Sequence, residues 1–261
     1  MTNIRQPAVA GLFYPDKPDI LKSMISDYLQ QVAPVNKAPQ AIIVPHAGYI
    51  YSGEIAASAY ARLQPRRNSI KRVILLGPSH KVSFAGLALS HAEAFRTPLG
   101  DIPVDAAATA TIIQFPFVEY VDQAHLYEHS LEVQLPFLQM ALDSFKLLPI
   151  VVGDCPAEQI EQVLELFYGK DDTLIVISSD LSHFHDYATA QRLDKKTSEK
   201  IEHLDYQHLN YDSACGLAPV SGLMALAKKK SLQIETIDLR NSGDTAGDKS
   251  RVVGYGAYVI N

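Results

Sequence analysis

Three strands predicted from the sequence run directly into turn-forming residues that include a histidine. The segments are Val44-Pro45-His46-Ala47-Gly48-Tyr49, Leu76-Gly77-Pro78-Ser79-His80 and Ser178-Ser179-Asp180-Leu181-Ser182-His183. In an open α/β sheet the ligand crevice lies beyond the carboxyl ends of the strands, so we expect His46, His80 and His183 to share one cleft. A lone histidine is better explained as a hydrogen-bonded loop residue, whereas three at matching positions favour a site. Proline and glycine beside the first two fix tight turns, which suits imidazoles that hold a metal.

Cys215 is a candidate for the same chemistry. It lies shortly before Pro219 and an apolar run over residues 220–227 that is typical of a helix. The positive end of a helix favours the thiolate, which is the form that binds metals. The local sequence fits a small buried apolar side chain equally well. Cys155 has no comparable neighbours, so we interpret it as such a side chain.

Residues 125–129 match the H-x-x-E-H pattern of inverted zinc proteases. That chemistry needs His125 and His129 on one helical face, with Glu128 as the general base. Pro136 is tolerated only in the first turn of a helix, so the helix that follows is predicted to begin near Leu131 and Glu132. His125 would then lie outside the helix, which weakens the protease interpretation. His129 would point from the helix start toward a cleft.

The elements that must position these residues alternate between strands and helices. Apolar, β-branched runs predict strands over residues 41–44, 73–76, 147–152, 174–178, 234–239 and 255–260. Helical spacing of apolar residues predicts helices over 19–31, 53–63, 106–113, 131–142 and 157–167. Alternation of this kind favours an α/β fold with a mostly parallel central sheet flanked by helices. The proline-containing connector over 33–39 is too short for a linker, so residues 1–261 are expected to form a single domain.

Composition narrows the classes of partner. Hydrophobic residues make up 47% and charged residues 20%, as in ordinary globular enzymes. The formal net charge of -6, from 29 acidic and 23 basic residues, argues against a nucleic-acid partner. No run approaches the roughly 18 apolar residues of a membrane-spanning helix, and residues 1–15 do not resemble a signal peptide. We therefore expect no membrane association and a cytoplasmic protein, and two cysteines predict no disulfide framework.

The ordered motifs of the chain resemble those of a known family. They are Arg5-Gln6-Pro7-Ala8-Val9-Ala10-Gly11-Leu12-Phe13-Tyr14-Pro15, Pro45-His46-Ala47-Gly48-Tyr49, Gly77-Pro78-Ser79-His80, Glu128-His129-Ser130-Leu131-Glu132, Ser178-Ser179-Asp180-Leu181-Ser182-His183 and Gly254-Tyr255-Gly256. Over nearly its whole length the sequence is similar to the Memo family, also called protein B of the AmmeMemoRadiSam system. The resemblance implies a fold like that of the class III, non-haem iron extradiol dioxygenases.

The resemblance also implies roles for particular residues. Iron (Fe²⁺) or copper would be held by His46, His80 and Cys215. His129 and His183 fall where the ring-cleaving enzymes keep histidines that orient or protonate substrate and oxygen, and Asp180 belongs to the same cleft. A small molecule or peptide is the implied occupant of that cleft, and other proteins of the AmmeMemoRadiSam system are the implied partners.

Cysteine departs from the dioxygenase pattern, whose third iron ligand is a carboxylate. A thiolate is softer and more easily oxidised, which suits Cu(I), Zn²⁺ or Fe²⁺ and favours a non-haem metal redox protein over ordinary ring cleavage. Two alternatives stay open. One is an extradiol dioxygenase that works despite the cysteine, and the other is a module that binds a peptide or protein in the same cleft.

Overall fold

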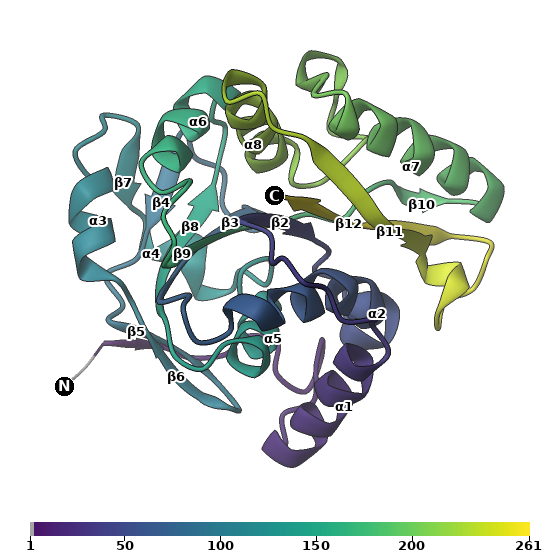
Figure 1. The fold of residues 1–261 in the computed structure, drawn as a ribbon, viewed down its shortest axis with the longest axis horizontal. Coiled ribbons are helices and arrows are strands. Elements are labelled where there is room, and N and C mark those ends of the chain that lie inside the picture. Colours follow the sequence, from purple (N-terminus) through teal and green to yellow (C-terminus); the bar gives the residue numbers. More distant parts are fainter. Residues whose placement is uncertain (1–2) are drawn as a thin grey trace.

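A computed structural model describes residues 3–261 of the chain. A mixed sheet of nine strands runs through the molecule (Figure 1). Its strands are β2 (Ala41–Val44), β3 (Arg72–Pro78), β4 (Leu87–Leu89), β7 (Val118–Tyr120), β8 (Lys146–Val152), β9 (Thr173–Ser178), β10 (His183–His185), β11 (Ile234–Asn241) and β12 (Val252–Ile260). The strand order is β10-β12-β2-β9-β3-β8-β4-β7, and β11 pairs with β12. Strands β1 (Ile4–Arg5), β5 (Ala94–Thr97) and β6 (Gly100–Pro103) form a separate small sheet.

The centre of the large sheet is parallel, and an antiparallel pair joins it to each flank. Strands β2, β9, β3 and β8 pair in parallel. Antiparallel pairs join β12 to β2 on one side and β4 to β8 on the other. The expected mostly parallel sheet is therefore found in the four central strands, whose carboxyl ends meet at one edge.

Helices cover both faces of the sheet. They are α1 (Pro18–Gln30), α2 (Tyr49–Tyr60), α3 (Ala106–Ile112), α4 (Asp122–Leu126), α5 (Gln134–Ala141), α6 (Ala157–Glu165), α7 (Tyr187–Glu202) and α8 (Leu217–Lys229), with short 3₁₀ turns η1 (Ala61–Arg66), η2 (Tyr206–His208) and η3 (Ser242–Asp244). Figure 1 shows α1, α2 and α5 on one side of the sheet and α6 and α8 on the other.

The apolar core explains this layering. Along β3, Val73 and Leu75 join the cluster under α1, α2 and α5, while Ile74 and Leu76 join the cluster under α6 and α8. Successive side chains of a strand point to opposite faces, so a strand covered on both faces must be apolar throughout. The chain is thus a single α/β domain, as predicted.

None of the helices formed by residues 3–261 combines the length and the apolar character that crossing a membrane requires.

Candidate metal centre

His46, His80 and Cys215 lie together beyond the carboxyl ends of the parallel strands. His46 follows β2 after Pro45, His80 is separated from the end of β3 by Ser79, and Cys215 directly precedes the N-cap of α8. One ligand atom from each side chain falls within 4.8 Å of the other two. The Cys215 Sγ is 3.2 Å from the Nε2 of His46. Two imidazoles and a thiol in this arrangement could hold a metal ion.

The hydrogen-bond network around His46 fixes which ring nitrogen faces the cluster. The Ser178 hydroxyl donates its single hydrogen to the Ser130 carbonyl oxygen at 2.6 Å. It accepts from the Gln134 amide at 2.8 Å, which leaves one lone pair for the Nδ1 of His46 at 2.9 Å. Nδ1 must therefore carry the proton, and Nε2 presents its lone pair toward Cys215.

A carboxylate fixes which ring nitrogen of His80 faces the cluster. The Nδ1 of His80 lies 2.9 Å from Oε1 of Glu128, and an ionised carboxylate can accept a hydrogen bond but cannot donate one. Burial alone would raise the pKa of Glu128, but its hydrogen bonds from His80 and from backbone amides lower it to about 2. Nδ1 of His80 is therefore the donor, and its Nε2 is free to act as a ligand.

Burial sets the protonation of the other two members. The side chain of His46 is 2% exposed, and burial lowers its pKa well below 6.5, so the imidazole is neutral as a metal ligand must be. Burial raises the pKa of the Cys215 thiol, and the nearby Asp180 raises it further. The thiolate expected from the helix N-terminus is thus not favoured in the metal-free chain, because removal from water outweighs the helix dipole.

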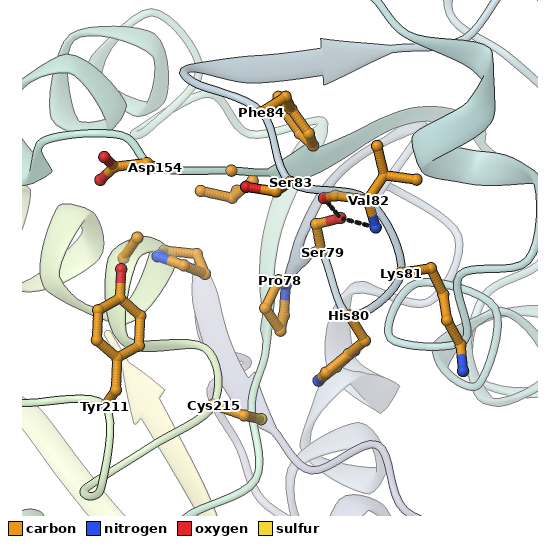
Figure 2. Close-up of a pocket in the computed structure, with 14 residues that line it drawn as sticks. Pro78, Ser79, His80, Lys81, Val82, Ser83, Phe84, Asp154, Tyr211 and Cys215 are labelled. Atoms are coloured by element: carbon orange, nitrogen blue, oxygen red, sulfur yellow. Dashed lines mark hydrogen bonds between the residues drawn. The ribbon is translucent and has the colours of Figure 1, made fainter.

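Two cavities flank the cluster. The first, here the Cys215 cavity, has a volume of about 420 Å³ and is lined by His80, Ser83, Asp154, Tyr211 and Cys215 among others. Figure 2 shows the side chains of His80 and Cys215 pointing toward one another at one end of it. The second, here the His183 cavity, has a volume of about 470 Å³, and its lining includes Phe13, Tyr51, His129, Asp180, His183 and Arg251.

Sequence comparison agrees with the motifs. The family described as Memo-like protein matches residues 5–259 of the chain. The chain belongs to the Memo family. A MEMO1 family protein of Aquifex aeolicus is 39% identical over 265 residues, covering 97% of each chain. One of Sulfolobus acidocaldarius is 37% identical over 277 residues, again 97% of each, and one of Thermoplasma acidophilum is 33% identical over 264 residues and 98% of each.

The remaining residues implied by the Memo resemblance surround the cluster and line the His183 cavity beside it. The His129 ring stacks on His80 with centroids 4.5 Å apart and meets His46 edge-on at 5.5 Å. Asp180 accepts the backbone N–H of His46 at 2.7 Å, and its own N–H donates to the Cys215 sulfur at 3.3 Å. Burial lowers the pKa of His129 and raises that of Asp180.

His183 lies in the cavity next to the cluster. It begins β10, which pairs antiparallel with β12 at the margin of the sheet, and it lines the His183 cavity. His80 lines the Cys215 cavity instead. The charge of His183 acts on both His46 and Asp180, so His183 lies near the cluster, although His80 and His183 line different cavities.

The inverted zinc-protease interpretation is wrong for this chain. His125 lies in the short α4, and its Nε2 bonds the carbonyl oxygen of Ala88 at 2.9 Å, away from His129. Burial lowers the pKa of His125 to about 4. The helix expected from Leu131 begins three residues later, at Gln134, because residues 130–133 form a turn.

The sequence alone did not show that three further residues hold the site. Glu128 and Ser178 anchor the two imidazoles, and Gln134 completes the network by bonding the carbonyl oxygen of Pro45 at 2.8 Å. A polar residue amid the apolar residues of α5 was the one available signal for Gln134. Cys155 is buried among apolar side chains, as interpreted, and burial raises its pKa to about 11.

Proposed function

We propose that this Memo family chain binds a redox-active metal ion, Fe²⁺ or copper, through His46, His80 and Cys215. The observation that carries the proposal is the hydrogen bonding that turns the Nε2 lone pairs of both imidazoles toward the cluster, where the Cys215 sulfur completes the donor set. Imidazole with thiolate suits iron, copper or zinc. With three protein ligands, a bound metal would keep a position open for oxygen or another small molecule.

The residues of the His183 cavity supply proton transfer in this proposal. His129 and His183 line that cavity, and histidine is the side chain that most often serves as a general acid or base. His129 also packs against Phe13, with ring centroids 4.8 Å apart, so its ring is held between an aromatic face and His80. A molecule in this cavity would meet a positioned acid or base beside the metal cluster.

The test is the metal content of protein purified without added metal. We expect iron or copper in the wild type and its loss in Cys215→Ser, because the hydroxyl is a poorer ligand for these ions. Cys155→Ser is the matched control, since it changes the other cysteine, which lies outside the cluster. Wild type and Cys215→Ser both lacking iron and copper would end the proposal, as would equal metal in all three proteins.

A second candidate function is extradiol ring cleavage, favoured by the size and lining of the His183 cavity. About 470 Å³ between Phe13 and Tyr51 is enough for a single aromatic ring, and His129, Asp180 and His183 lie in its wall. Oxygen uptake by the iron-loaded protein with a panel of catechols should then depend on His183 and be lost in His183→Ala. No uptake with any catechol would contradict ring cleavage while leaving the metal site untouched.

A further inference from the structure

Glu128 is the most heavily hydrogen-bonded acid beside the cluster. Its Oε1 accepts from Nδ1 of His80 and from the backbone N–H groups of His129 and Ser130, each at 2.9 Å. Its Oε2 accepts the backbone N–H of His80 at 2.6 Å. The carboxylate thus bonds both the ring and the main chain of one residue, which leaves that side chain no freedom to turn.

We propose that Glu128 is a positioning residue that holds His80 with Nδ1 protonated and Nε2 directed at the metal, an inference that rests on the proposed metal function. His80, Glu128 and His129 also lie close enough together to suggest a second ligand set. Glu128 acts there as a hydrogen-bond acceptor, because three N–H donors converge on its Oε1 and a fourth donates to its Oε2. Its role is exerted through His80.

The two proposed ligand imidazoles therefore have different partners. The Nδ1 of His46 bonds the neutral hydroxyl of Ser178, whereas the Nδ1 of His80 bonds the Glu128 carboxylate. A carboxylate that accepts from the far nitrogen of an imidazole makes the near nitrogen a stronger donor. The carboxylate is 1% exposed, and among residues 3–261 no lysine or arginine side chain pairs with it. Positive charge arriving on His80 with a metal would offset the cost of burying it.

The first test needs no substitution. Heteronuclear NMR of the metal-free wild type reports which ring nitrogen of His80 carries the proton in the neutral form. We expect Nδ1 to be protonated and Nε2 to be bare. A His80 ring protonated on Nε2 would overturn the assignment, whether or not the chain binds metal.

The second test compares Zn²⁺ affinity by competition with a chromophoric chelator. Glu128→Gln removes the charge at nearly constant size, and we expect it to bind Zn²⁺ about 10–100-fold more weakly than wild type. Asp122→Asn is the matched control, because Asp122 pairs with the exposed His91 outside the cluster and its loss should leave affinity unchanged. Thermal unfolding of each variant verifies that it is folded.

The outcomes separate this inference from the metal proposal. Glu128→Gln that is folded and binds Zn²⁺ as tightly as wild type contradicts the positioning role alone. A wild type that binds no Zn²⁺ contradicts the metal site itself. If Glu128→Gln does not fold, the NMR measurement on the wild type decides the question.

Discussion

Arg5 offers a sharp test of how the segment beside the cluster is held. Its guanidinium is buried and makes an ion pair with the Glu132 carboxylate. It also donates to the carbonyl oxygen of His125 at 3.0 Å and to that of Glu128 at 2.6 Å. One side chain from β1 thus ties together both ends of the segment that carries Glu128 and His129.

The expected loss of stability in Arg5→Met follows from the burial of the ion pair. Glu132 is 1% exposed, so Arg5→Met would leave an anion without its cation in the interior. Breaking a buried pair from one side costs about 3–5 kcal/mol. Glu132 would still accept from the N–H groups of Ala8 and Val9 and from the Tyr14 hydroxyl, so we expect a loss near the lower value, about 3 kcal/mol. That is a large share of the roughly 5–15 kcal/mol that stabilises a domain.

Urea unfolding followed by circular dichroism measures this loss as a lower midpoint with an unchanged slope. Arg67→Met is the control, because the side chains of the Arg67 and Asp143 pair are 42% and 50% exposed. Exposed pairs contribute at most about 1 kcal/mol, so the control should unfold close to wild type. If Arg5→Met were no less stable than Arg67→Met, burial would not determine how much the Arg5 pair contributes to stability, and the reasoning would be refuted.

Three further predictions concern stability. Burial lowers the pKa of His125 to about 4, so below pH 6.5 the unfolded chain gains a proton that the folded chain does not. The free energy of unfolding should therefore fall by up to about 3 kcal/mol between pH 6.5 and 4. In His125→Gln the same pH profile should be flatter. In Gly254→Ala the new Cβ would lie 2.0 Å from Oδ2 of Asp194, so thermal unfolding should show a loss of about 1–3 kcal/mol, and an unchanged midpoint would contradict the packing. Ser178→Ala leaves the buried Gln134 amide and His46 Nδ1 each short of an acceptor, which should cost about 1–3 kcal/mol in urea unfolding.

The central strands could be predicted because their faces are both buried. The predicted strand over 41–44 coincides with β2, and β8 and β9 begin one residue before their predicted starts. Short strands such as β4 and β10 were not predicted, because three residues give too little periodicity to distinguish a strand from a loop. They form only where a long neighbouring strand offers a free edge.

The two imidazoles and the sulfur were predictable for different reasons. His46 and His80 follow parallel strands, so the topology alone directs them to one edge of the sheet. Cys215 follows a loop and reaches the same place only through the packing of α8, which local sequence does not encode, and its assignment came from the family resemblance. The hydrogen bond between His80 and Glu128 could not be predicted from the sequence, because the two residues are 48 positions apart in the chain.

The protonation of Cys215 shows why local reasoning about a site can give the wrong sign. A helix N-terminus favours a thiolate by up to about 2 kcal/mol, or little more than one pKa unit. Full burial can raise the pKa of such a group by as much as about 3–5 units. The carboxylate of Asp180 raises the pKa of Cys215 as well. Only a cation placed against the sulfur reverses this balance, since a coordinated thiol gives up its proton. His46 is already neutral, so a metal ion and a proton would compete directly for the sulfur, and metal affinity should rise with pH.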